Sequence, residues 1–239
     1  MPGVDYYYLV NKEYGLKKYK LISFDMFQTL VDVNTQKDAV MRRLFGNEYS
    51  SDKADKLWKD FNTLIFSYFH NICEGDEGFR TVARIFEQCY TELFPKHGIK
   101  LEPKEGAYIL SSAHADSLLY DDVKEFVERI QDRYMTCVIS DTDTVMIEKI
   151  LDQFSFDFVF TSEEYQSYKS DGSSRLFNAA FSMSGIEPHE MLHIGDGLSD
   201  IAGSKMAGAD AAWINRGGKE WRHAIKPDYI VSSLLEIPI

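Results

Sequence analysis

The chain has 239 residues, of which 44% are hydrophobic and 14% aromatic. This composition excludes a disordered or low-complexity protein, and the length suffices for one or two domains with a full hydrophobic core. There are 38 acidic and 26 basic residues, which gives a formal net charge of −12. Because nucleic acids and anionic membrane surfaces attract basic proteins, we expect neither as a partner.

The three cysteines are scattered and form no C-x-x-C pair, which argues against a disulfide framework and against a thiolate zinc site: Cys73, Cys89 and Cys137. The first residues contain no apolar run of the kind found in signal peptides. No segment approaches the ~20 apolar residues that a membrane span needs. These features predict a cytoplasmic protein.

The first half of the chain contains one predicted strand and a long helical segment. Residues 1–17 are rich in tyrosine and lysine without a clear period, and we treat them as an N-terminal extension. A short apolar run follows and ends at Asp25, which is typical of a buried parallel strand. Residues 36–117 then show apolar positions at helical spacing, and we call this predicted all-helical segment the helical insert.

From residue 118 onward, predicted helices and strands alternate. The helices are expected at 121–133, 145–154, 174–184 and 198–207, and the strands at 135–140, 156–161, 191–194, 211–214 and 229–231. Such alternation predicts βαβ units and therefore an α/β fold with a doubly wound, Rossmann-like parallel sheet. Its core is predicted at 18–35 and 118–239, interrupted by the helical insert. His193, inside a strand, is expected to be an ordinary core histidine.

Polar side chains stand where these strands end. Asp25 ends the first strand in FDMFQTL, and Ser140 ends the next in VISDTD. Asp196 and Asp200 follow a later strand in HIGDGLSD, and Lys169 lies in the loop before the helix at 174–184. Ligands bind beyond the carboxyl ends of parallel strands, so we expect these groups to converge on one edge. Taken singly, each also fits an ordinary role as a helix cap, a turn residue or a solvated surface group.

These four segments, in this order, resemble the sequence motifs of the haloacid dehalogenase-like (HAD) hydrolase superfamily. The resemblance runs from the first predicted strand to the C-terminus, with the helical insert where the family carries a smaller cap domain. It implies that Asp25 is the nucleophile, that Ser140 binds phosphate and that Lys169 is the lysine of the third motif. Asp196 and Asp200 match the acidic pair of the fourth motif.

The resemblance also implies a Mg²⁺ cofactor and a small phosphorylated substrate. A carboxylate nucleophile beside a phosphate dianion needs its charge offset, and Mg²⁺ held by carboxylates does this. The predicted metal-site residues are Asp25, the backbone carbonyl of Phe27, Asp196 and Asp200, the last of which would orient metal-bound water or the lysine. Lys169 is expected to neutralise both Asp25 and the transferring group.

Three residues depart from the pattern of the family's phosphatases. Phe27 stands where they carry a second aspartate, which serves as the general acid and base. Gln28 replaces a glycine and Asp141 replaces an asparagine, and both are candidate phosphate- or substrate-binding residues. General acid–base catalysis contributes about 10²–10⁴-fold, so the loss predicts slow turnover and favours activated esters such as acyl or aryl phosphates.

Three hypotheses about function remain open at this point. The leading one is Mg²⁺-dependent hydrolysis of a small phosphorylated metabolite through an aspartyl-phosphate on Asp25. The second is carbon–halogen hydrolysis, which needs no metal and suits Phe27, because haloacid dehalogenases carry a tyrosine there. Asp196 and Asp200 disfavour it, since they place negative charge near a substrate carboxylate. The third is a catalytically silent ligand-binding or interaction module. The sequence leaves the substrate and the oligomeric state open.

Overall fold

The computed structural model describes residues 18–74 and 78–238. The predicted N-terminal extension, residues 1–17, lies outside the described residues, and so does the side chain of Cys73. Cys89 and Cys137 are free thiols in the buried interior. No helix in the described ranges combines the length and the hydropathy that a membrane span requires.

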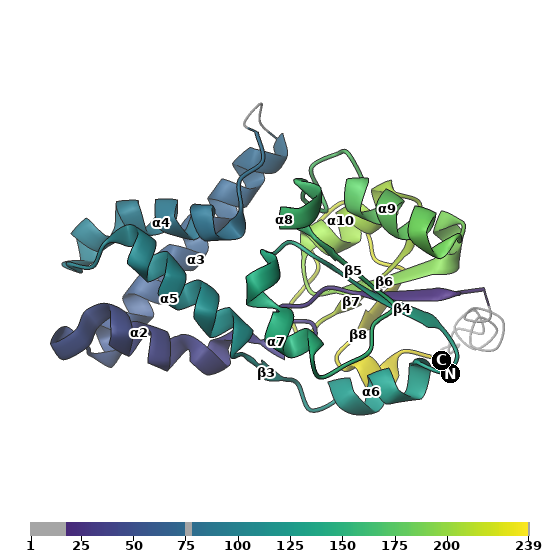
Figure 1. The fold of residues 1–239 in the computed structure, drawn as a ribbon, viewed down its shortest axis with the longest axis horizontal. Coiled ribbons are helices and arrows are strands. Elements are labelled where there is room, and N and C mark those ends of the chain that lie inside the picture. The colour runs from purple at the N-terminus through teal and green to yellow at the C-terminus, as the bar shows by residue number, and fades with distance from the viewer. Residues whose placement is uncertain (1–17, 75–77, 239) are drawn as a thin grey trace, which may run out of the picture.

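A parallel sheet forms the centre of the α/β core (Figure 1). Six strands of the described chain lie in the order β5-β4-β1-β6-β7-β8. Their bounds are β1 Leu21–Phe24, β4 Met135–Ser140, β5 Phe158–Thr161, β6 Met191–Gly195, β7 Asp210–Ile214 and β8 Tyr229–Val231. The chain runs outward from β1 to β4 and β5, then returns to β6, β7 and β8 on the other side. Strand order therefore reverses around β1, which is where open α/β sheets bind ligands.

Successive residues of the central strands bury their side chains on opposite faces of the sheet. In β1, Leu21 joins the apolar cluster on one face, while Ile22 and Phe24 join the cluster on the other. Figure 1 shows α9 and α10 over one face and α6 over the opposite one. These helices span Arg175–Ser184, Leu198–Met206 and Val123–Ile130. Because both faces are covered, the strands appear in the sequence as continuous apolar runs, and the predicted doubly wound sheet is confirmed.

The helical insert leaves the core after β1. It contains α2 Lys37–Phe45, α3 Ser51–Glu74, α4 Val82–His97 and α5 Pro103–Ala115, which lie to one side of the sheet in Figure 1. Strands β2 Val31–Asp32 and β3 Leu118–Leu119 pair antiparallel where the chain enters and leaves these helices. Two-residue strands carry no hydrophobic period, so the sequence gives no sign of this pairing.

The predicted helix at 145–154 is wrong in form. The structure has a 3₁₀ turn at Thr144–Met146 and a short helix α7 at Glu148–Leu151. Asp143 occupies the N-cap position of that turn, yet its carboxylate accepts from the backbone N–H groups of Val82 and Ala83, at 2.7 and 2.8 Å. The residue that would cap a longer helix is thus bonded to another element. A short helix α8, Ser162–Tyr165, directly after β5 was not foreseen either.

Candidate active site

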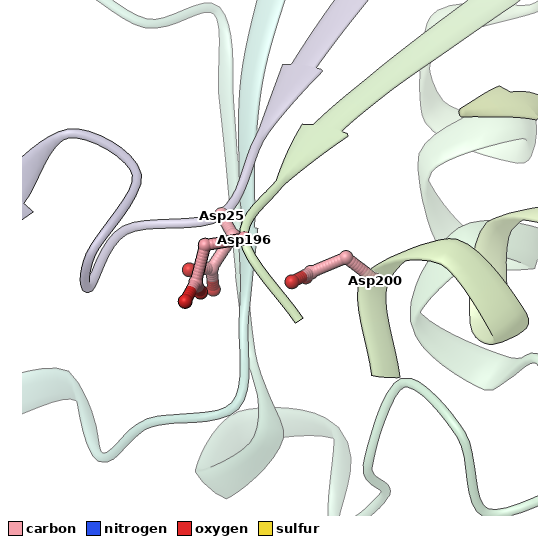
Figure 2. Close-up of side chains that lie close together, drawn as sticks. All are labelled: Asp25, Asp196 and Asp200. Atoms are coloured by element: carbon pink, nitrogen blue, oxygen red, sulfur yellow. The ribbon is translucent and has the colours of Figure 1, made fainter. Parts of the chain in front are cut away.

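Three carboxylates meet at the carboxyl end of the central strands (Figure 2). Asp25 follows β1, Asp196 follows β6, and Asp200 lies in the first turn of α10. One oxygen of each side chain lies within 4.8 Å of an oxygen of the other two. Figure 2 shows Asp25 and Asp196 side by side and Asp200 pointing toward them from the helix. The structure thus brings together the acidic residues that the sequence singled out.

Lys169 and Ser140 complete the cluster. The Lys169 ammonium lies 2.7 Å from Asp25 Oδ1 and also bonds Asp200 Oδ1, while the Ser140 hydroxyl donates to Asp25 Oδ1 at 3.0 Å. All four side chains are buried. Asp25 Oδ2 has no hydrogen-bond partner among the described residues, and it keeps some exposure to solvent. One oxygen of Asp25 is therefore held in place, while the other remains accessible.

Two glycines allow α10 to lie close to these groups. A Cβ on Gly195 would lie 2.1 Å from Asp200 Cγ, and a Cβ on Gly203 would lie 2.3 Å from the carbonyl oxygen of Lys169. A larger residue at position 195 would displace the Asp200 side chain, and one at position 203 would move the backbone of Lys169 away from α10. Gly195 and Gly203 thus serve the placement of Asp200 and Lys169.

His193 bonds Asp200 from inside the sheet. Its Nε2 lies 3.2 Å from Asp200 Oδ1, and its Nδ1 lies 2.8 Å from Ser23 Oγ. The side chain is fully buried, as expected for a core histidine, but its bond to Asp200 was not predicted. The sequence offers one signal: His193 and Gly195 lie two residues apart in β6 and therefore on the same face, and Asp200 packs against Gly195 on that face.

The cluster carries more negative than positive charge. Burial, with Asp200 and Asp25 adding to it, raises the pKa of Asp196 to about 8. Burial also raises the pKa of Asp25, although Lys169 opposes this. Burial acts in the same direction on Asp200, but Lys169 and His193 outweigh it and lower the pKa of Asp200. Three carboxylates thus share one lysine, and Asp196 is the carboxyl that keeps its proton at neutral pH when no cation is bound.

The donor set fits a hard divalent cation. Asp25, Asp196 and Asp200 offer only carboxylate oxygens, which are the ligands that Mg²⁺ prefers. The Asp196 carboxylate makes no hydrogen bond or ion pair with any described residue, so it is free to bind a cation. That the Phe27 carbonyl is a fourth metal ligand stays a prediction, and so does the identity of the ion as Mg²⁺.

Phe27 faces the helical insert. Its ring packs edge-on against His114 of α5, with the ring centroids 4.8 Å apart. Gln28, the next residue, adopts a left-handed backbone with φ +62°, and its Oε1 accepts from the Tyr120 hydroxyl at 2.6 Å. The position of the family's second aspartate is thus filled by an aromatic contact between core and insert. A substrate contact by Gln28 stays a prediction.

Asp141 supports the loop that carries the lysine. Its Oδ1 accepts from the backbone N–H of Lys169 at 2.8 Å, and burial raises its pKa to about 7. A direct contact with phosphate, as the sequence suggested, stays a prediction. The observed bond instead gives Asp141 a part in placing Lys169 beside Asp25.

The helical insert also contacts the loops that carry the site residues. Besides the bonds from Asp143 to the first turn of α4, the hydroxyl of Tyr168 donates to the carbonyl oxygen of Arg80 at 2.7 Å. Tyr168 directly precedes Lys169, and its ring lies 5.3 Å from that of Phe69 in α3. These contacts were missed because nothing local in the sequence links a loop residue to a distant helix.

Comparison with known proteins identifies the family. The sequence profile of the haloacid dehalogenase-like hydrolases matches residues 19–208. The chain belongs to this family, and it is a hydrolase.

Individual relatives cover nearly the whole chain. It is 27% identical to the pyrimidine 5′-nucleotidase PynA of Streptococcus pneumoniae, over 92% of this chain and 93% of that protein. The structure is similar to that of the putative HAD-hydrolase YfnB of Bacillus subtilis, described as bound to magnesium, with a TM-score of 0.77, 21% identity and coverage of 91% and 96%. It is also similar to the L-2-haloacid dehalogenase of Xanthobacter autotrophicus, with a TM-score of 0.76, 16% identity and coverage of 92% and 97%. At these identities, the two structures support the fold alone.

Proposed function

We propose that this protein is a Mg²⁺-dependent phosphatase that hydrolyses a small phosphorylated metabolite through an aspartyl-phosphate on Asp25. The observation that carries the proposal is the state of the Asp25 carboxylate. Lys169 and Ser140 hold one of its oxygens, the other is accessible, and two further carboxylates stand close by. This arrangement combines an oriented nucleophile with an oxygen-ligand site for a cation.

The reaction takes two steps on Asp25. Its free oxygen attacks phosphorus, the bond from phosphorus to the leaving oxygen breaks, and the electron pair departs with that oxygen. Water then attacks the phosphoryl group, which releases phosphate and restores the carboxylate. Lys169 offsets charge on Asp25 and on the transferring group, and Ser140 fixes the carboxylate. Bound Mg²⁺ would supply the remaining positive charge against phosphate and carboxylates.

The leaving group sets the limit on substrates. Phe27 has no proton to donate, so the departing oxygen must be stable as an anion or take its proton from water. Acyl and aryl phosphates meet this condition better than alkyl phosphates. The pyrimidine 5′-nucleotidase relative supports phosphomonoesters as the chemical class. Pyrimidine nucleoside 5′-monophosphates therefore belong in the substrate panel, as alkyl-type esters with a slow expected rate.

The helical insert would act as a cap domain over this site. Its contacts run to three loops at the carboxyl end of the sheet, through Phe27, Asp143 and Tyr168. A cap in this place excludes water and contacts the part of the substrate that is not phosphate. We propose the predicted domain division, with the cap at residues 36–117 and the core at 18–35 and 118–239.

The test is hydrolysis of p-nitrophenyl phosphate with and without Mg²⁺. We expect turnover that requires the metal and is abolished in Asp25→Asn, because an amide is a poor nucleophile. Asp132→Asn, an exposed position without a hydrogen bond or ion pair among the described residues, is the matched control and should keep full activity. Turnover that survives in Asp25→Asn, or that is unaffected by removal of the metal, would contradict the proposal.

Phe27 supports one other activity, carbon–halogen hydrolysis. A halide leaves without a proton, so an aromatic residue at this position is no handicap. Halide release from a 2-haloacid in the presence of EDTA would favour this activity over phosphatase activity. If neither reaction occurs while a phosphorylated ligand raises the unfolding temperature, the protein is a ligand-binding module.

A further inference from the structure

A chain of hydrogen bonds runs from the interior of the sheet to the active site. It begins at Ser23 in β1, passes through both ring nitrogens of His193 in β6 and ends on Asp200, which bonds Lys169. We infer that His193 is a positioning residue that fixes the Asp200 carboxylate and, through it, the Lys169 ammonium. The inference deepens the proposed function and rests on it for the role of Lys169.

The donors on Asp200 show why this bond matters. Lys169 Nζ and His193 Nε2 both bond Oδ1, while the backbone N–H of Gly197 donates to Oδ2 at 2.9 Å. A carboxylate only accepts, so Nε2 must carry the hydrogen. Without His193, the lysine alone would hold Oδ1, and it is shared with Asp25. Of the three donors only Lys169 and the N–H of Gly197 would remain, so the carboxylate could turn about the bond between Cβ and Cγ and Oδ1 would be less firmly fixed beside Lys169.

The sheet fixes the ring of His193 from the other side. Ser23 and His193 are register partners in neighbouring parallel strands, and their side chains share one face. The ring of Phe177 in α9 packs edge-on against the imidazole, with centroids 5.1 Å apart. With Nε2 donating to Asp200, a neutral ring accepts at Nδ1 from the Ser23 hydroxyl, which sets the tautomer. A side chain that merely filled this space would need neither bond.

Two amide variants separate positioning from space filling. In His193→Gln, the amide nitrogen reaches the region of Nε2 and can still donate to Asp200. In His193→Asn, the shorter side chain reaches only the region of Nδ1, so it can keep Ser23 but loses Asp200. Loss of a partner that orients a metal-site residue typically lowers metal affinity or activity about 10–100-fold. For His193→Asn we expect a loss in this range, both in Mg²⁺ affinity and in kcat, with a smaller effect on KM. For His193→Gln we expect both quantities to be largely restored.

Three measurements make the outcome decisive. Titration calorimetry gives the Mg²⁺ affinity without any turnover, thermal unfolding gives the stability, and crystal structures of the metal-free variants give the orientation of the Asp200 carboxylate. We expect Asp200 rotated away from Lys169 in His193→Asn and retained in His193→Gln. Ser23→Ala, which leaves the imidazole in place, should cause a smaller loss than His193→Asn.

The inference and the proposed function can fail separately. If the wild-type protein hydrolyses no phosphate ester, the proposed function fails, while Mg²⁺ affinity and the metal-free structures still decide the role of His193. Unchanged orientation of Asp200 in His193→Asn would overturn the inference. Equal Mg²⁺ affinities for Asn and Gln, or losses that follow the unfolding temperature alone, would overturn it as well.

Discussion

Phe27 gives the sharpest prediction about a single residue. If the site lacks only its general acid and base, Phe27→Asp should raise kcat/KM on alkyl phosphates, whose leaving group needs a proton. The gain should be smaller on aryl phosphates. We expect an increase below the ~10²–10⁴-fold range of general acid–base catalysis, because Gln28 also changes the loop and the new carboxylate must be well positioned. The measurement is the ratio of alkyl to aryl rates.

Phe27→Asn is the matched control for that experiment. It has the size and polarity of aspartate without its proton chemistry, and it removes the ring contact with His114 equally. Burying a polar group where a ring packed destabilises the protein, so the unfolding temperature must be measured for both variants. A ratio that is unchanged in a folded, Mg²⁺-binding Phe27→Asp protein would rule out the missing acid as the cause of slow turnover.

Asp196 should make the metal-free protein less stable at high pH. The pKa of this carboxyl in the folded protein is about 8, against 3.8 in the unfolded chain, so the folded state binds the proton more tightly. Stability from this group is present below pH 4 and is lost as pH rises toward 8. Asp196→Asn removes the charge and should stabilise the metal-free protein above pH 8. The gain should be several kcal/mol, because the ionised carboxylate loses its hydration on burial and lies beside the charges of Asp200 and Asp25.

Urea unfolding in EDTA at pH 5 and pH 9 measures this difference. The variant and the wild type should differ more at pH 9 than at pH 5. An equal difference at both pH values would show that Asp196 titrates normally.

The same carboxyl should make metal binding depend on pH. A cation binds the ionised form, so Mg²⁺ must displace the proton that Asp196 holds below pH 8. We expect the apparent affinity for Mg²⁺ to rise between pH 6 and pH 8 and to level off above that. Calorimetry in buffers with different ionisation enthalpies should detect proton release on binding near neutral pH. Asp196→Asn should bind Mg²⁺ much more weakly and release fewer protons.

At the scale of single elements, Gly203 in α10 should reverse an ordinary helix rule. Alanine inside a helix is usually about 1 kcal/mol more favourable than glycine. Here the added Cβ would lie 2.3 Å from the Lys169 carbonyl oxygen, which is backbone and cannot move aside cheaply. Gly203→Ala should therefore destabilise the protein and lower kcat by displacing Lys169. Gly78→Ala, where a Cβ meets nothing within 4 Å, is the control and should change neither property.

The elements that the sequence predicted well are those with enough residues to show a period or an apolar run. The strand predicted at 135–140 has those bounds in the structure, and the helices at 174–184 and 198–207 differ from theirs by one residue at one end. The paired strands β2 and β3 and the helix α8 are too short for such a signal. The helix predicted at 145–154 is shorter in the structure. Asp143, which would cap a longer helix there, instead accepts from backbone N–H groups in the first turn of α4.

Part of the candidate site could likewise be predicted from the sequence, and part of it could not. Its strand-end residues could be predicted to converge because the carboxyl ends of parallel strands share one edge. Asp25, Ser140, Lys169 and Asp200 do lie in direct contact or share a partner. The bond from His193 to Asp200 could not be predicted, since it depends on how closely α10 lies over Gly195.

At the scale of the whole molecule, Asp143 fastens the helical insert to the core. Its carboxylate accepts from the first two backbone N–H groups of α4, at 2.7 and 2.8 Å, where the helix dipole also favours a negative charge. Asp143 lies three residues after Ser140. The same loop thus carries a predicted phosphate ligand and the bond that holds α4 near the site.

Asp143→Ala should therefore change both stability and catalysis. Losing a side-chain acceptor at a helix N-terminus costs about 0.5–2 kcal/mol. A more weakly held insert should also admit water and bind the non-phosphate part of the substrate less well, which raises KM. Thr81→Ala is the matched control, because the Thr81 hydroxyl caps the same helix from within the insert by accepting from the N–H of Arg84 at 3.3 Å. It should lose similar stability and keep the wild-type KM. If the two variants raise KM equally, or neither raises it, Asp143 stabilises the helix without holding the insert over the site.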